Sequence, residues 1–160
     1  MNVFAGNEQV ATSVVAAEIG FTDNQMTDLY NRDLKTLEAI LPPKPDKMGK
    51  ARYYNRAQFG MACLLSDLVV AEFKVPLAAK IAQFILAAHE REPDVEQFAI
   101  VHTANGNIST LPYSRALLET GFVSGARLSF GIVIDLKNYA DRVAIAIANA
   151  PRVIGGEDGE

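Results

Sequence analysis

Polar side chains that can hydrogen-bond to base edges lie together between positions 24 and 32 of the chain. Met26, Leu29 and Tyr30 have the i, i+3, i+4 spacing of one buried helical face, which leaves the intervening residues on the opposite face. A side-chain amide can pair with adenine, and a guanidinium can pair with guanine. Ordinary surface residues would give the same pattern, so the neighbouring segments must decide between the two interpretations. The polar residues on this face are Asn24, Gln25, Thr27, Asn31 and Arg32.

A basic segment follows at residues 44–56. It carries five Lys or Arg residues and one acidic residue, a local balance of +4 in a chain whose net charge is −4. Because salt screens charges beyond about 8–10 Å, this local balance governs attraction to phosphate groups. A solvated surface loop would have a similar composition. The residues that could contact a phosphate backbone are Lys35, Lys44, Lys47, Lys50 and Arg52, with Tyr53 and Tyr54 as hydroxyl donors.

The elements that must position these residues are mostly helical in the first half. Capping residues, glycines and prolines set their limits: Ser13 and Asn55 can cap helices, Gly20 can end one, and Pro42 must stop another. A helix apolar on nearly every side, at 57–72, is expected to be central to the core. The expected order is a helix over 13–19, a helix from Thr22 or Asp23 to about 41, a Pro-rich loop over 42–52, a strand at 51–54, and helices over 57–72 and 76–92.

The alternation of strand-like and helix-like segments in the second half is typical of a small α/β module. Asn105-Gly106 predicts a tight hairpin in which both turn residues have positive φ. Asp135 is placed to cap a final helix. The expected elements are strands at 98–101, 108–113 and 125–134, a short helix from Ser114 to Gly121, and a final helix over about 136–147.

Three segments of the first half resemble the DNA-binding domain of MerR-type transcription regulators. The first is Ala16-Ala17-Glu18-Ile19-Gly20-Phe21-Thr22, similar to the first helix and turn of that family. The second combines Ile40-Leu41-Pro42-Pro43 with Gly49-Lys50-Ala51-Arg52-Tyr53-Tyr54, similar to the wing. The third, Phe73 to Ile81, is similar to the step that opens the next helix. The resemblance covers about half of the chain and implies a winged helix-turn-helix that binds double-stranded DNA.

Other classes of function find little support in the sequence. Cys63 is the only cysteine, which excludes an intramolecular disulfide framework and a multi-cysteine zinc site, and its apolar surroundings predict a buried core residue. His89 and His102 lack a carboxylate pattern and are expected to be surface or capping residues. No nucleophile elbow, phosphate-binding loop or dinucleotide fingerprint occurs. We therefore expect no enzyme, no metal and no cofactor, and a cytoplasmic protein without a membrane span.

Together these observations predict an α+β protein with two parts and a tail. Residues 8–92 would form the MerR-like winged helix-turn-helix, residues 95–150 a small α/β dimerisation or effector module, and residues 151–160 a flexible tail. The expected function is a sequence-specific DNA-binding transcription regulator, bacterial or phage-like, acting as a homodimer on two half-sites. The hairpin at 105–106 and the last helix are the candidate dimer surfaces.

Two other functions remain open at the level of sequence. The first is an architectural, excisionase-like DNA-binding factor. The second is a protein-interaction or ligand-binding module that does not bind DNA and acts through its acidic second half.

Overall fold

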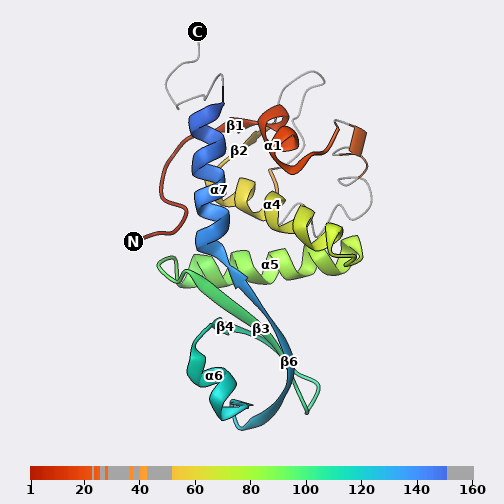
Figure 1. Cartoon of the computed structure of the whole chain (residues 1–160), viewed down its shortest axis with the longest axis vertical. Coiled ribbons are helices and arrows are strands. Elements are labelled where there is room, and N and C mark those ends of the chain that lie inside the picture. The colour runs from red at the N-terminus through yellow and green to blue at the C-terminus, as the bar shows by residue number, and fades with distance from the viewer. Residues whose placement is uncertain (23, 26–27, 29–36, 38–39, 43–51, 151–160) are drawn as a thin grey trace.

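The computed structural model describes residues 1–22, 24–25, 28, 37, 40–42 and 52–150. The tail expected at 151–160 and most of the helix expected from residue 22 to residue 41 lie outside the described residues. The described part forms a helical body and an antiparallel β-arm, residues 93–135, that projects from the body (Figure 1). This mixture of helices and antiparallel strands agrees with the predicted α+β class. In this part of the chain no helix combines the length and apolarity needed to cross a membrane.

The helical body begins with a short ribbon and a helix. Strand β1 (Val10–Ala11) leads directly into α1 (Thr12–Ile19) and pairs antiparallel with β2 (Tyr53–Tyr54). Because the strand runs straight into the helix, Ala11 takes the N-cap position and Ser13 does not act as the expected cap. Gly20 ends α1 as predicted, with a φ of 73° that glycine adopts without strain.

Two long helices build the centre of the body. Helix α4 (Arg56–Val70) is buried along most of its length, as its all-round apolar pattern predicted, and α5 (Val75–Arg91) packs beside it. The Asn55 side chain accepts a hydrogen bond from the Gln58 backbone N–H at 2.8 Å, and the Gln58 side chain accepts one from the Asn55 N–H at 2.9 Å. This reciprocal capping box satisfies two backbone donors at the start of α4.

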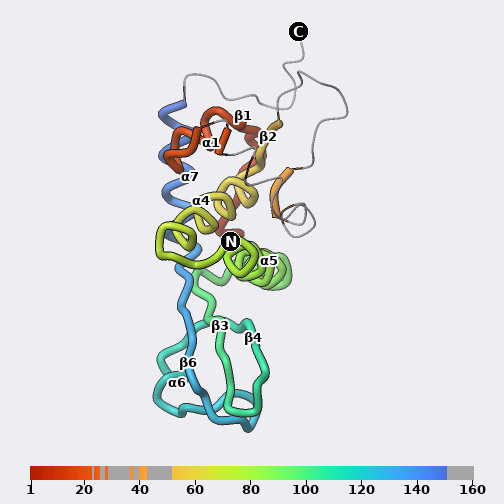
Figure 2. Tube along the Cα trace, turned by 90° about the vertical axis from the view of Figure 1, so that its right-hand side faces the viewer, coloured from red at the N-terminus to blue at the C-terminus, as the bar shows by residue number. Residues whose placement is uncertain are grey.

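The β-arm is a four-stranded antiparallel sheet in the order β4-β3-β6-β5. Helix α6 covers one face of the sheet, where a small cluster forms from Ala99, Val101, Leu117 and Val123. Figure 2 shows β3 between β4 and β6, with α5 crossing near the base of the arm. The elements of the arm are β3 (Gln97–Thr103), β4 (Ile108–Pro112), α6 (Arg115–Thr120), β5 (Phe122–Val123) and β6 (Ala126–Asp135).

The β3–β4 hairpin uses a different turn from the one expected. The β3–β4 hairpin is present, but among its loop residues Gly106 has a positive φ, 84°, and Asn105 does not. The Gly106 N–H donates to the Thr103 carbonyl at 2.9 Å, and the Thr103 N–H donates to the Asn107 carbonyl at 3.0 Å, so the loop between the strands is longer than the predicted two-residue turn. The two-residue turn with positive φ at both positions occurs instead at Ser124-Gly125, between β5 and β6.

The last helix returns from the arm to the body. Helix α7 (Leu136–Asn149) starts where β6 ends, and Asp135 caps it as predicted by accepting from the Asn138 N–H at 3.2 Å. It packs along α4 (Figure 1). Phe98, Leu136 and Val143 belong to the same buried cluster as residues of α1 and α4. The main core is therefore continuous across the boundary predicted near residues 92–95.

We expect removal of the α4 cap to lower stability measurably. Replacing Asn55 with Ala (N55A) removes the side-chain acceptor of the capping box and should lower the free energy of unfolding by about 1 kcal/mol. Ser114 is the matched control, because it holds the N-cap position of α6 without a side-chain hydrogen bond. Urea denaturation followed by circular dichroism should therefore separate N55A from S114A. Equal losses in both variants would contradict the capping explanation.

Candidate nucleic-acid interface

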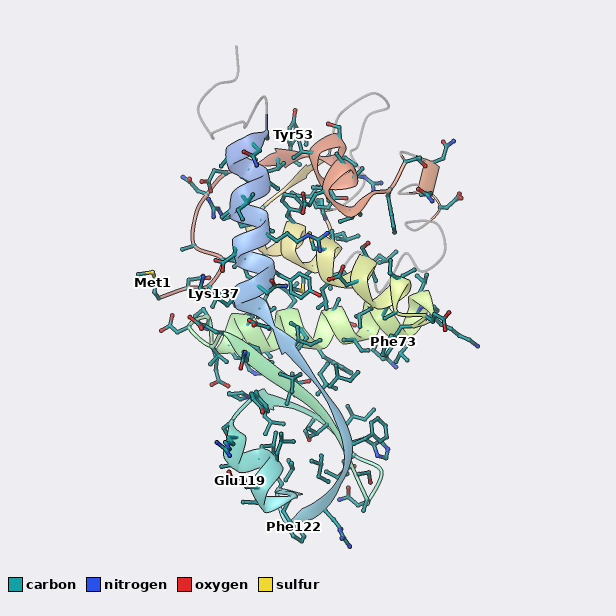
Figure 3. The ribbon with its side chains drawn as sticks, viewed as in Figure 1. Met1, Tyr53, Phe73, Glu119, Phe122 and Lys137 are labelled. Atoms are coloured by element: carbon teal, nitrogen blue, oxygen red, sulfur yellow. The ribbon has the colours of Figure 1, made fainter. Side chains whose placement is uncertain are left out.

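The structure describes part of the predicted DNA-binding set: Asn24, Gln25, Arg52, Tyr53 and Tyr54. The remaining predicted residues lie outside the described residues; they are Thr27, Asn31, Arg32, Lys35, Lys44, Lys47 and Lys50. The described members occur at two places, one shortly after α1 and the other on β2 or directly before it. Figure 3 shows that Tyr53 on β2 lies at the opposite end of the molecule from Phe122 in the arm. The candidate site is therefore on the helical body, far from the tip of the arm.

A tight turn after α1 leads into a second helical start. The Phe21 N–H donates to the Ala16 carbonyl at 2.9 Å, which closes the end of α1 around Gly20. The Thr22 hydroxyl accepts from the Gln25 N–H at 3.2 Å, and the Gln25 side-chain oxygen accepts from the Thr22 N–H at 2.8 Å. These bonds form a capping box with Thr22 as the N-cap, one of the two residues predicted for that role.

The capping box changes the role expected for Gln25. Bidentate pairing with adenine needs both the oxygen and the NH₂ of a side-chain amide. The Gln25 oxygen is already bonded to the Thr22 N–H, so the amide is held against the backbone and Gln25 acts as a helix cap in this conformation. Asn24 is exposed in the same first turn. Of these two amides, Asn24 is the better candidate for contact with a base.

The β1–β2 ribbon fixes the end of the basic segment. The Arg52 carbonyl accepts hydrogen bonds from the backbone N–H of Thr12 at 3.1 Å and from its hydroxyl at 3.2 Å. Tyr53 is 38% exposed, whereas Tyr54 is completely buried. Successive strand residues point to opposite faces, so only one of two adjacent tyrosines can face solvent. The expected Tyr54 contact with a phosphate is wrong for this reason, while Tyr53 remains accessible.

Arg56, at the end of the basic segment, forms a bidentate ion pair with Glu8. Its Nε and Nη2 atoms donate to the two carboxylate oxygens of Glu8 at 2.8 and 2.7 Å. These hydrogen bonds lower the pKa of Glu8 to about 2. The pair neutralises Arg56, so its charge adds little to attraction of phosphate. Sequence reasoning did not identify Glu8, because nothing local connects residues separated by 48 positions.

Neither histidine is an ordinary surface residue. His89 is only 5% exposed and lies edge-to-face against Phe4, with ring centres 5.2 Å apart. Burial lowers the pKa of His89, so the neutral ring is favoured at the end of α5. His102 stacks on Phe130 with ring centres 5.0 Å apart.

Cys63 is buried inside α4, as predicted. Its burial raises the pKa of the thiol to about 12, so the thiol stays protonated and unreactive near neutral pH. Across the described ranges, no group of three or more His, Cys, Asp or Glu residues is arranged to hold a metal ion.

An apolar groove lies between α5 and the β-arm. This apolar groove has a volume of about 210 Å³ and is lined by residues of α5 and of the sheet face that α6 does not cover. Leu77 and Phe84 of α5 are 50% and 37% exposed at its margin. The principal apolar residues of the groove are Leu77, Ile81, Phe84, Ile100, Phe130 and Ile132.

Comparison with known proteins found no family model that matches the chain and no curated protein that matches it in sequence.

The Glu8–Arg56 pair predicts a specific pH dependence of stability. Glu8 has a lower pKa in the folded protein than in the unfolded chain, so its stabilising contribution is present above about pH 5 and is lost as pH falls from 4.5 toward 2. Replacing Glu8 with Gln (E8Q) should therefore destabilise the protein at about pH 7, and the difference from the unsubstituted protein should shrink in acid. Urea unfolding at a series of pH values measures this difference.

The control is E119Q, because Glu119 pairs with Arg115 on the surface with side chains 63% and 90% exposed. Such exposed ion pairs contribute little to the free energy of unfolding, so E119Q should be as stable as the unsubstituted protein at every pH. A gap between E8Q and the unsubstituted protein that stays constant down to about pH 2 would show that the carboxylate charge is not responsible.

Proposed function

We propose that this chain is a sequence-specific regulator of transcription that binds double-stranded DNA as a homodimer. Its first half would form a winged helix-turn-helix of the MerR type. The observation that carries the proposal is the Thr22–Gln25 capping box, which begins a new helix after a short glycine-containing turn at the end of α1. Asn24 is exposed in the first turn of this new helix.

The chemistry of the first turn suits contact with bases. In a helix-turn-helix, the N-terminal residues of the second helix contact base edges in the major groove. Asn24 stands at that position, and the sequence places Thr27, Asn31 and Arg32 further along the same segment. Asn can pair with adenine and Arg with guanine, whereas Thr can contact several different bases. Specificity would therefore come mainly from Asn24, Asn31 and Arg32.

The basic segment would form the wing and contact the phosphate backbone. Thr12 holds the Arg52 carbonyl with two hydrogen bonds, so the end of this segment is attached to the start of α1. Tyr53 is exposed beside it and can donate its hydroxyl to a phosphate. Lys44, Lys47 and Lys50 supply the positive charge in this proposal. Arg56 is not part of the contact set, because Glu8 neutralises it.

A cytoplasmic location and the absence of an enzymatic reaction are parts of the same proposal.

An architectural, excisionase-like role would use the same surface and would differ in bending DNA at several adjacent sites. A protein-interaction role without DNA has separate support in the apolar groove beside α5. The DNA measurement below distinguishes the proposed function from that last alternative.

We expect the wing lysines to control DNA affinity and its salt dependence. Replacing Lys47 and Lys50 with Glu (K47E/K50E) should reduce affinity for duplex DNA by at least about 10-fold near roughly 100 mM salt, because two phosphate contacts are lost and two repulsive charges are added. The slope of log affinity against log salt should fall in magnitude by about 2. Fluorescence anisotropy between about 50 and 300 mM salt measures both quantities.

The matched control is K74E/K80E, which changes the net charge by the same amount at two exposed positions, one at the start of α5 and one within it. This control should bind DNA nearly as the unsubstituted protein does. Equal effects of the two double variants would mean that only net charge matters. Absence of binding by the unsubstituted protein at the lowest salt would overturn the proposed function.

A further inference from the structure

Residues 1–5 lie on the surface of the helical body, and we call this segment the N-terminal strap. It has neither helix nor strand and runs along one side of the body toward β1 (Figure 1). The Val3 N–H donates to the Pro93 carbonyl at 2.9 Å, which joins the strap to the loop after α5. Beyond the strap, the Glu8–Arg56 ion pair and the β1–β2 ribbon hold the chain to the body. The strap can therefore separate from the body without disturbing β1.

A single buried side chain holds the strap in place. Of residues 1–9, Phe4 is the one that is buried. Its ring occupies the space beside α4 that a side chain at position 60 would fill, because a Cβ on Gly60 would lie 2.5 Å from Cε1 and Cζ of Phe4. Glycine inside a helix is destabilising relative to alanine, so the room that it leaves for the Phe4 ring explains its presence in α4. The attachment of the strap depends on this one ring.

His89 of α5 is a buried titratable residue in contact with Phe4. The two rings meet edge-to-face, with an angle of 86° between their planes. The Nδ1 atom of His89 is buried and has no hydrogen-bond partner among the described residues. A neutral ring with its proton on Nε2 tolerates this position, because Nδ1 then carries only a lone pair. Protonation turns both ring nitrogens into donors, and Nδ1–H would then be a buried donor without an acceptor.

The charged groups around His89 leave burial as the main influence on its ring. Glu90, the next residue on α5, is the charged group among the described residues that acts on the pKa of His89, and it opposes the effect of burial. On α4 the Cys63 thiol stays protonated near neutral pH. Of the two strands that contact α5, β3 carries His102 and β4 carries no titratable residue. Burial prevails, and it favours the neutral ring.

We propose that Phe4 and His89 form a pH-sensitive latch, which keeps the strap closed while His89 is neutral and releases it when His89 takes up a proton. Release withdraws the Phe4 ring and lets water accept a hydrogen bond from the imidazolium. The latch goes beyond the proposed function, because it uses none of the predicted DNA-binding residues and holds whether or not the chain binds DNA.

The sign of the pH dependence follows from the direction of the pKa shift. The pKa of His89 is lower in the closed state than its ordinary value of 6.5, so the latch is fully closed above about pH 7 and weakens as pH falls below 6.5. The contribution of Glu8 is lost only below about pH 4.5, which separates the two effects. The ion pair between the Met1 ammonium and Asp94 is exposed and adds little to closure.

Amide hydrogen exchange of Val3 in the full chain measures opening of the strap, because its N–H is bonded to the Pro93 carbonyl. The protection factor, measured by NMR, removes the intrinsic effect of pH on exchange. We expect it to fall at least about 5-fold between about pH 7.5 and about pH 5, since protonation of His89 favours the open strap. A protection factor that stays constant over this range would overturn the latch.

The chain has two histidines, which gives a matched pair of variants. H89F keeps a buried ring but cannot take up a proton, so the protection factor of Val3 should become independent of pH. H102F is the control, because His102 lies on β3 and does not contact the strap. It should keep the full response. A response that persists in H89F, or that disappears in H102F, would contradict the proposal.

A second variant tests the latch without changing His89. F4A removes the ring that holds the strap, so Val3 should lose most of its protection at about pH 7.5. The pKa of His89, measured from its ring signals, should rise toward 6.5 because water then reaches the imidazole. The matched control is F130A, which removes the ring stacked on His102 and should leave both quantities unchanged. An unchanged pKa of His89 in folded F4A would overturn the latch, even if H89F does not fold.

Discussion

The attachment of α7 to the helical body is the contact on which the rest of the structure depends. Arg142 on α7 donates to the Glu18 carboxylate at 2.8 Å and to Asp67 at 3.3 Å, and the Tyr139 hydroxyl donates to Asp67 at 2.7 Å. These groups join α7 to α1 and α4. They are partly exposed, so their ion pairs add only modestly to stability and mainly select one orientation of α7. Most of the free energy comes from the buried apolar face of the helix.

This attachment turns the β-arm into a fixed extension of the body. The chain leaves α5 through β3 and returns through β6 into α7, so both long strands of the arm are continuous with body helices. Helix α7 in turn contacts α1 through Arg142 and Glu18, and the proposed DNA-binding helix begins directly after α1. The arm is therefore joined to the body by packed helices at both of its long strands.

Local chemistry made much of the secondary structure predictable. The caps at Asn55 and Asp135 and the helix ends at Gly20 and Gly121 depend on bonds across three or four residues, and all are found. The turn at Asn105-Gly106 was predicted less well. Its sequence suits a two-residue hairpin, but the register of β3 with β4 leaves more residues in the loop, so a different turn forms. Register is a property of the pairing strands rather than of the turn residues alone.

By itself the sequence determined the α+β class, the main helices, the caps at Asn55 and Asp135, and a candidate set of DNA-binding residues, because each depends on spacing or composition within a short segment. Only the tertiary structure decided that Tyr54 is buried while Tyr53 is exposed, and that Glu8 neutralises Arg56. It also decided that α7 joins the core of the first half and that β5 pairs only with the first two residues of β6. These outcomes depend on which distant surfaces exclude water together. The hydrophobic effect is non-directional, so a local sequence pattern cannot specify which distant apolar surfaces pack together.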